Sequence, residues 1–331
     1  MAVLKKKLAF LFSVMLVFSV AGYVVCAMAG SKQIEKSERE TLVVSSFYPM
    51  YVLTKNLLAE AETLEVRNLT ENQIGCLHDY QLTAGDMKLL SEAKAFIING
   101  AGMELFMEKV LAEFTELPVI TASEGIELLE EMGHMHVHGE EQEEEPEHDA
   151  GEEQDEETGH IHAENGHVWM DVERYREQAV NVCAELVTLF PQEKDNILKE
   201  WRAYDARLME FSGEVDELRT ETENRYVVVF HDAFVYLADS LGMEVISVLA
   251  LDEETVPSAG EIAEVIEEIH HHGEAWIFIE EMYASHANKI VAETGAKVIF
   301  LDPLVTGKGD AEDYLLGMQK NIENIKSALT E

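Results

Sequence analysis

The chain has 331 residues, with 24 Lys and Arg against 65 Asp and Glu, which gives a formal net charge of -41. So negative a chain disfavours nucleic acid and anionic membrane surfaces as partners, because both are bound through Lys and Arg contacts. The 47% hydrophobic content is that of a globular protein, and the length allows two domains of ordinary size. The three cysteines, Cys26, Cys76 and Cys183, fit neither a disulfide framework nor a C-x-x-C zinc pattern.

The N-terminal segment has the pattern of a secretory signal. Lys5–Lys7 precede an apolar run that ends near Val25, and the small-residue motif Ala27–Ala29 follows. We therefore expect residues 1–29 to direct export to the periplasm or the cell surface, with an uncleaved membrane anchor as the alternative. Cys26 is a candidate for lipid modification, but the residues before it lack the small side chain that such processing prefers. Lipid-anchored and free forms both stay open.

From Thr41 onward, β-rich apolar runs alternate with helical periodicity. Thr83 and Asp86 resemble a capping box that opens a helix through Leu90, and apolar residues between Glu104 and Phe114 recur at intervals of three and four. This βαβα order predicts a mainly parallel sheet with helices on its faces. The expected strands are Thr41–Phe47, Leu64–Leu69, Ala95–Asn99 and Val119–Ala122.

A second set of four strands follows residue 224, so the chain is expected to form two similar α/β lobes. These strands are Tyr226–Phe230, Val245–Leu251, Ala275–Ile279 and Lys297–Leu301. Helices are expected between and after them, near residues 232–241, 258–272, 284–294 and 311–329. The run His270–His272 precedes Gly273 and is typical of a helix end more than of a metal site.

Between the two sets lies the most regular helical pattern, which begins near Pro191 and continues through Thr222. A helix of roughly 30 residues would be about 45 Å long, enough to join both lobes as a rigid strut. The alternative is an ordinary long helix inside one lobe. The predicted organisation is therefore a tether at 30–40, an N-terminal lobe at 41–190, a linking helix at 191–222 and a C-terminal lobe at 223–331.

The segment from Glu130 to Gly166 holds fifteen Asp and Glu, no Lys or Arg, and six histidines. Such a stretch cannot bury a core, so we expect residues 133–166 to form a disordered loop. Acidic runs usually serve only as solvating segments, but imidazole is a poor solubiliser and the commonest neutral metal ligand. The loop is therefore expected to bind metal through His134, His136, His138, His148, His160 and His162.

Three other histidines and one aspartate occupy comparable places in the predicted lobes. His78 lies in the loop after the second strand, His167 follows the acidic loop and opens a helix, and His231 ends a strand. Asp302 ends the last strand, and Pro303 restricts the backbone beyond it. Because ligands of open α/β sheets bind outside the carboxyl ends of the strands, these four side chains are expected to meet between the lobes. Three imidazoles and one carboxylate suit Zn(II) better than Ca(II) or Mg(II).

Four local motifs follow one another along the chain: Gly75-Cys76-Leu77-His78-Asp79-Tyr80, His167-Val168-Trp169-Met170-Asp171, Phe230-His231-Asp232-Ala233-Phe234 and Leu301-Asp302-Pro303-Leu304. They resemble, in order, the motifs of the metal-binding (cluster A-I) substrate-binding proteins of bacterial ABC transporters, most of all the zinc-uptake branch. The resemblance covers nearly all of the chain after the signal. It implies two (β/α)4 lobes joined by a long backbone helix, one metal ion in the inter-lobe cleft, and delivery of that ion to a membrane permease.

By these motifs, the resemblance implies three imidazole ligands, His78, His167 and His231, and Asp302 stands at the family's C-terminal carboxylate position. In manganese and iron relatives the third position is typically a carboxylate, so His231 favours zinc. Leu77 stands where the family often has Pro or Glu, which leaves Asp302 or a water as the expected fourth ligand. Cys76 is expected to be a packed thiol, with a thiolate ligand as the alternative. Glu280 follows a strand end, where the family commonly has Glu, and is a candidate to orient a histidine ligand.

The sequence thus predicts a monomeric, non-enzymatic zinc receptor whose histidine-rich loop captures or senses additional zinc. One alternative keeps the family and changes the metal to manganese or iron. A second alternative is a secreted zinc hydrolase, since three histidines with an open position can activate water. The hydrolase is disfavoured because the sequence has no H-E-x-x-H motif and pairs no general base with a nucleophile.

Overall fold

A computed structural model describes residues 41–71, 80–132, 164–249 and 257–330. The predicted signal, the tether, the segment around His78 and most of the acidic loop lie outside the described residues. Among the helices that are described, none combines the length and apolar character needed to cross a membrane.

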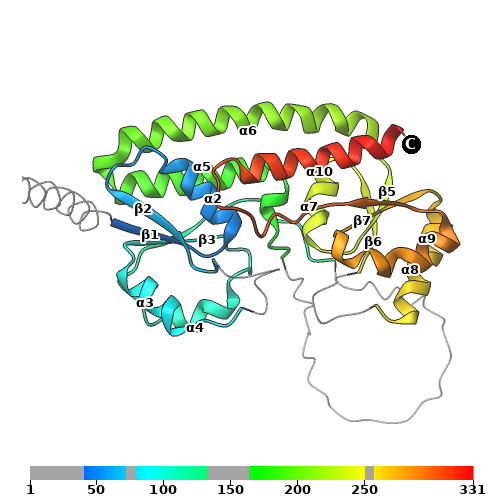
Figure 1. The fold of residues 1–331 in the computed structure, drawn as a ribbon, viewed down its shortest axis with the longest axis horizontal. Coiled ribbons are helices and arrows are strands. Elements are labelled where there is room, and N and C mark those ends of the chain that lie inside the picture. Colours follow the sequence, from blue (N-terminus) through cyan, green and yellow to red (C-terminus); the bar gives the residue numbers. More distant parts are fainter. Residues whose placement is uncertain (1–40, 72–79, 133–163, 250–256, 331) are drawn as a thin grey trace, which may run out of the picture.

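The first lobe is built on a four-stranded parallel sheet with the strand order β2-β1-β3-β4. The second lobe repeats this arrangement with the order β6-β5-β7-β8. The two lobes lie side by side in Figure 1, each with its own sheet. The strands are β1 (Thr41–Ser45), β2 (Leu64–Asn68), β3 (Ala95–Ile98), β4 (Val119–Thr121), β5 (Tyr226–Val229), β6 (Glu244–Val248), β7 (Ala275–Ile279) and β8 (Lys297–Phe300).

Helices cover both faces of the sheets, which explains why most strand residues are apolar. One layer contains α2 (Tyr48–Leu57), α5 (Val172–Leu189), α6 (Lys194–Thr222), α7 (Ala233–Ser240) and α10 (Asp313–Thr330). The opposite faces carry α3 (Ala84–Glu92) and α4 (Glu108–Leu111) in the first lobe, and α8 (Ala259–His272) and α9 (Ala284–Thr294) in the second. In the part of the chain that the structure describes, short 3-10 turns lie at 105–107, 168–170, 191–193 and 281–283.

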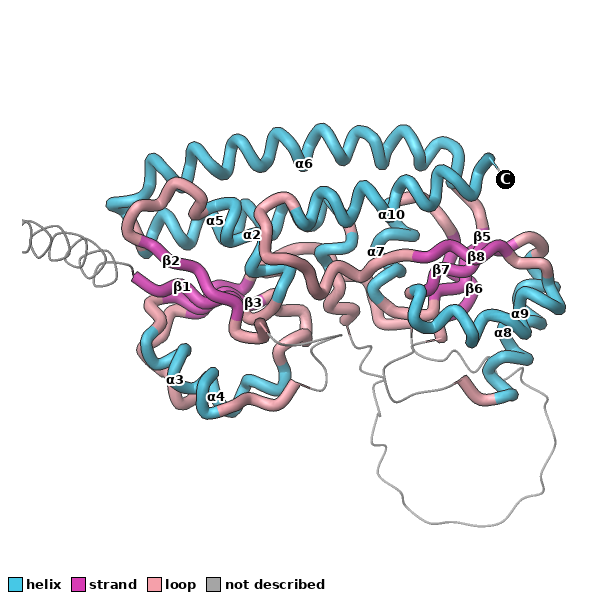
Figure 2. The backbone as a smooth tube through the Cα atoms, in the orientation of Figure 1, coloured by secondary structure: helices cyan, strands magenta, loops and turns pink. Residues whose placement is uncertain are grey.

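The long helix α6 has 29 residues, so it extends about 44 Å and runs along both lobes (Figures 1 and 2). Its buried residues include Tyr204, Leu208 and Val215, which recur at helical spacing. They belong to one apolar core that also contains residues of both lobes, such as Val43 of β1 and Val229 of β5. The strut predicted from the sequence therefore belongs to a continuous core that joins the lobes.

Several local predictions are confirmed. Thr83 and Asp86 form the predicted capping box, and α3 continues to Glu92. Helix α8 ends at His272, where Gly273 adopts a positive φ of 101°, as expected of a helix stop. The helical pattern between Glu104 and Phe114 is shorter than predicted, because it forms only a 3-10 turn and the four-residue α4.

Candidate metal centre

Two of the predicted ligands, His167 and His231, lie next to each other where the lobes meet. Their ring centroids are 5.1 Å apart and their planes cross at 81°. His231 follows β5, and His167 precedes the 3-10 turn Val168–Met170, so residues far apart in the chain supply the pair. His167 is only 4% exposed, and the His231 side chain is 12% exposed. The pair therefore occupies a largely desolvated position.

Glu280 holds the ring of His231. It follows β7, which is the hydrogen-bonded neighbour of β5, and its Oε1 lies 3.0 Å from Nδ1 of His231. A carboxylate can only accept here, so Nδ1 donates, and the lone pair of the neutral ring is then on Nε2. Glu280 therefore orients His231 and sets the tautomer that a metal ligand needs.

Asn165 does the same for His167. Its Oδ1 lies 2.9 Å from Nδ1 of His167 and also accepts the His167 backbone N–H at 3.0 Å. The amide cannot be reversed without losing a bond, because Asn165 Nδ2 donates to the Asp232 carbonyl at 3.0 Å. Asn165 thus connects His167 with the residue that follows His231.

The predicted disordered loop, residues 133–166, extends too far at its C-terminal end. Asn165 is only 3% exposed, and Glu164 forms an isolated bridge with Glu130. Tyr236 also donates from its hydroxyl to the Asn165 carbonyl at 2.7 Å. The sequence prediction missed Asn165 because it continued the acidic composition up to the histidine. An Asn two residues before a candidate ligand is the signal that the sequence offers, since Asn side chains commonly accept a hydrogen bond from the backbone two residues on.

Asp302 lies beyond the end of β8 in a firmly held turn. Asn321 of α10 brackets it, accepting the Asp302 N–H at 2.9 Å and donating to the Asp302 carbonyl at 2.8 Å. The Leu304 N–H donates to Oδ1 of Asp302 at 2.7 Å. Although Asp302 has an exposed surface, protein atoms crowd its carboxyl group. This desolvation raises the pKa of Asp302, and the negative charge of Glu280 adds to the rise, while the Leu304 N–H opposes it. A cation bound here would relieve the repulsion between the two carboxylates.

A buried carboxyl group supports the same region from the first lobe. Glu104 accepts from the Ser46 hydroxyl at 2.7 Å and from the backbone N–H groups of Asn99 and Gly100 at 2.8 and 3.0 Å. Asn99 in turn donates from Nδ2 to the carbonyl of Gly166, the residue before His167, at 2.9 Å. Burial raises the pKa of Glu104 to about 7 against these hydrogen bonds, which lower it.

The remaining predicted ligands are not placed. His78, Cys76 and the six histidines of the acidic loop lie outside the described residues. Within the described residues, no three His, Cys, Asp or Glu side chains converge closely enough to hold a metal ion. The structure therefore brings His167 and His231 together, each oriented by an oxygen acceptor, with Asp302 near Glu280.

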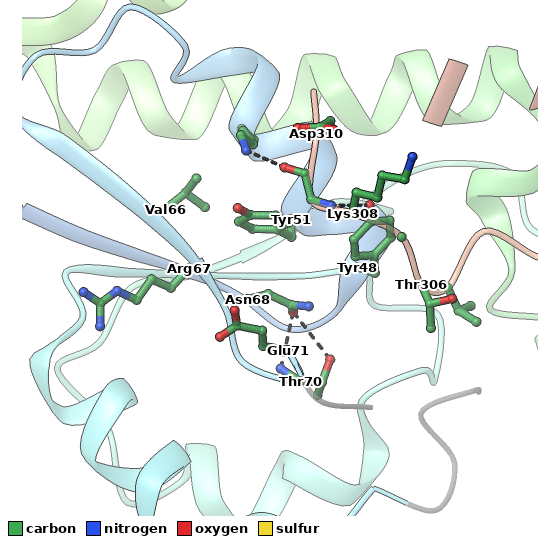
Figure 3. A pocket seen from close by; sticks show the side chains of 14 residues that line it. Tyr48, Tyr51, Val66, Arg67, Asn68, Thr70, Glu71, Thr306, Lys308 and Asp310 are labelled. Atoms are coloured by element: carbon green, nitrogen blue, oxygen red, sulfur yellow. Dashed lines mark hydrogen bonds between the residues drawn. The ribbon is translucent and has the colours of Figure 1, made fainter. Parts of the chain in front are cut away.

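A cavity of about 570 Å³ is lined in part by the segment that follows Asp302, and none of the predicted ligands lines it (Figure 3). It is enclosed by α2, the end of β2 and residues 305–310, a segment that follows Asp302. The Gly309 N–H donates to the Tyr48 hydroxyl at 2.9 Å, and Asn56 donates to the Ala311 carbonyl at 2.8 Å. The segment after Asp302 is thereby fastened to helix α2 of the first lobe.

Comparison with known proteins places this arrangement in a family. Residues 43–328 match the family model described as "Zinc-uptake complex component A periplasmic". The "Zinc-binding protein AdcA" of Streptococcus pyogenes serotype M3 is 27% identical over 330 residues, which cover 98% of this chain and 61% of that protein. The "High-affinity zinc uptake system protein ZnuA" of Bacillus subtilis is 28% identical over 313 residues, covering 92% of each chain.

Solved structures share the fold. FpvC of Pseudomonas aeruginosa, solved in complex with Mn2+, gives a TM-score of 0.70 at 21% identity and covers 88% of this chain and 98% of its own. The Zn(II)-bound ZnuA-like domain of Streptococcus pneumoniae AdcA gives a TM-score of 0.67 at 24% identity, covering 88% of this chain and 100% of its own. With the family model matched over most of its length, the chain belongs to the family of the zinc-uptake complex component A periplasmic proteins.

Proposed function

We propose that this protein is an extracytoplasmic receptor that binds Zn(II) with high affinity and delivers it to an ABC permease. The observation that carries the proposal is the adjacent pair of His167 and His231, in which each Nδ1 faces an oxygen acceptor. This arrangement sets the tautomer in which Nε2 of each ring would bind the metal. The names of the AdcA and ZnuA relatives support zinc, although this chain spans only 61% of the length of AdcA from S. pyogenes.

We assign the ligand set to His78, His167, His231 and Asp302, with Glu280 orienting His231. Three imidazoles and one carboxylate leave a centre of charge +1 around Zn(II), which a strongly acidic protein tolerates. Such a nitrogen-rich set favours zinc over manganese, for which oxygen ligands are preferred. A manganese receptor is the alternative function, because FpvC, which has the same fold, was solved with Mn2+.

The proposed role is capture and release, without covalent chemistry. Hydrogen bonds from His167 to Asn165 and from His231 to Glu280 hold the two rings in fixed orientations. A hydrolase would additionally need a general base placed to activate a metal-bound water. We further propose that the protein acts as a monomer outside the cytoplasm. The name "Zinc-binding lipoprotein AdcA" of the Streptococcus pneumoniae relative supports a lipid-anchored form, in which Cys26 would carry the lipid, and the free secreted form stays the alternative.

The acidic loop would collect zinc near the cleft. Its histidines supply imidazoles, and its carboxylates raise the local concentration of cations. Each loop site should be weak, because the composition predicts a disordered segment and ordering such a segment costs roughly 1 to 2 kcal/mol per residue fixed. Zinc uptake into cells at scarce zinc tests this role, and unchanged uptake after deletion of residues 133–163 would reduce the loop to a solvating segment.

Isothermal titration of the protein without residues 133–163 tests the proposal. We expect one tight zinc site that is lost in His231→Ala and retained in the control His271→Ala, which alters a histidine on α8. Metal analysis after exposure to equal zinc and manganese should find zinc. A loop-deleted protein without a tight zinc site would contradict the receptor role, and a preference for manganese would establish the alternative metal.

A further inference from the structure

The proposed site draws its ligands from both lobes, so something must fix the distance between them. His167 belongs to the segment that enters the 3-10 turn Val168–Met170, whereas Asp302 lies beyond the last strand of the second lobe. Trp169 connects the two. Its indole N–H donates to the carbonyl of Pro303 at 2.8 Å, across 134 residues of sequence.

This hydrogen bond, called the Trp169 bridge below, lies only one or two residues from each proposed ligand. Trp169 is two residues after His167, and the two rings lie with their centroids 5.1 Å apart. Pro303 is the residue directly after Asp302, whose backbone is bracketed by Asn321. One buried hydrogen bond therefore links the segment that carries His167 to the segment that carries Asp302.

The Trp169 bridge is also rigid. The Trp169 side chain is completely buried, and Phe47 packs against it edge to face with ring centroids 5.0 Å apart. The Tyr314 hydroxyl donates to the Trp169 carbonyl at 2.8 Å, while the Tyr314 ring stacks on Tyr175 at 3.8 Å between centroids. A close-packed interior of this kind resists small displacements, so the indole cannot shift without disturbing both lobes.

We propose that Trp169 is a positioning residue for metal binding, which fixes the separation between His167 and Asp302 through its hydrogen bond to Pro303. The inference rests on the proposed function and names the residue that sets the geometry of that site. Because this hydrogen bond joins two protein groups in a close-packed interior, it would preset the separation of the two segments to which an ion binds. Zinc affinity should then depend on Trp169 even though the indole does not touch the ion.

The test is zinc affinity of the full chain, measured against a competing chelator so that only the tight site fills. Trp169→Phe keeps an aromatic ring in the core and removes the N–H donor. We expect zinc binding to weaken about 10- to 100-fold, the usual effect of changing a residue that supports a metal ligand. Trp201→Phe is the matched control, because its indole N–H has no hydrogen-bond partner among the described residues, and it should bind zinc like the wild type.

A double-mutant cycle separates positioning from general destabilisation. In an Asp302→Ala background, Trp169→Phe should cause little further loss, because the ligand that it positions is gone. Tyr314→Phe provides a second, milder route, since it keeps the ring stack and removes only the hydroxyl that holds the Trp169 carbonyl. It should weaken zinc binding several-fold, again only when Asp302 is present.

Wild-type affinity in Trp169→Phe, or an equal loss with and without Asp302, would overturn the positioning role while the wild type still binds zinc tightly. If Asp302→Ala alone keeps full affinity, both this inference and the assignment of Asp302 as a ligand are wrong. Absence of tight zinc binding in the wild type would instead contradict the proposed function. Thermal unfolding of each variant in the absence of zinc identifies a variant that fails to fold. If Trp169→Phe fails to fold, the double-mutant cycle of Tyr314→Phe and Asp302→Ala tests the positioning role in its place.

Discussion

The buried carboxyl group of Glu104 should make the stability of the protein depend on pH in a specific window. Burial raises the pKa of Glu104 from 4.5 to about 7 in the folded protein. Between these values the folded state keeps a proton that the unfolded state has released. The contribution of Glu104 to stability is therefore fully present below about pH 4.5 and is lost as the pH rises through 7.

The magnitude follows from the size of this rise. At about 1.4 kcal/mol per pH unit, the whole window corresponds to roughly 3 kcal/mol, and the part between pH 5 and 8 to roughly 2.5 kcal/mol. Glu104→Gln removes the titrating proton and keeps the size of the side chain. The variant also loses one acceptor for the backbone N–H groups of Asn99 and Gly100, so its absolute stability is not the informative quantity.

The informative quantity is the change of the unfolding free energy with pH, measured by urea denaturation of metal-free protein at pH 5, 6, 7 and 8. Wild type should lose about 2.5 kcal/mol more than Glu104→Gln between pH 5 and 8. Glu113→Gln, at an exposed position, is the control and should follow the wild type. Equal pH dependence of wild type and Glu104→Gln would show that Glu104 does not carry a raised pKa in the folded protein.

Three further predictions concern the site and its surroundings. Glu280→Gln should weaken zinc binding about 10- to 100-fold, because an amide orients His231 less well than a carboxylate, and chelator competition measures this. Gly307→Ala should destabilise the protein by about 1 to 3 kcal/mol in urea denaturation, since a Cβ there would lie 2.1 Å from the Tyr48 hydroxyl. Gly213→Ala, inside α6 with open space around it, should instead stabilise by about 0.5 to 1 kcal/mol.

Each of these results has a contradicting outcome. Unchanged zinc affinity in Glu280→Gln would mean that the carboxylate does not orient a ligand. If Gly307→Ala were as stable as the wild type, the close packing of residues 305–310 on α2 would be wrong. A destabilising Gly213→Ala would contradict the exposed helical environment assigned to that residue.

The fold could be predicted from local patterns because its elements are regular. The periodicity of Leu208 and Val215 indicated a long helix, and the capping box at Thr83 marked a helix start. The ends of the strands could also be predicted from the apolar runs, which placed His231 and Asp302 at the carboxyl edge of the second sheet. A helix was also expected to open at His167, and α5 begins at Val172, five residues further on.

The supporting contacts of the site could not be predicted, because they join residues that are distant in sequence. Nothing local links Trp169 to Pro303, or Asn99 to Gly166. Asn165 was predicted to be disordered because the acidic composition continues up to it. In the structure its side-chain oxygen accepts from His167, and its side-chain nitrogen donates to Asp232. Sequence patterns gave the candidate ligands, whereas the side chains that orient them required the three-dimensional structure.

The central claim is that histidines of the two lobes hold the zinc ion. X-ray absorption at the zinc edge tests it most directly, using the protein without residues 133–163 loaded with one equivalent of zinc. We expect nitrogen and oxygen neighbours of zinc at about 2.0 to 2.1 Å, with one imidazole fewer in His231→Ala. Sulfur at about 2.3 Å, which would indicate Cys76, or an unchanged zinc environment in His231→Ala, would contradict the claim.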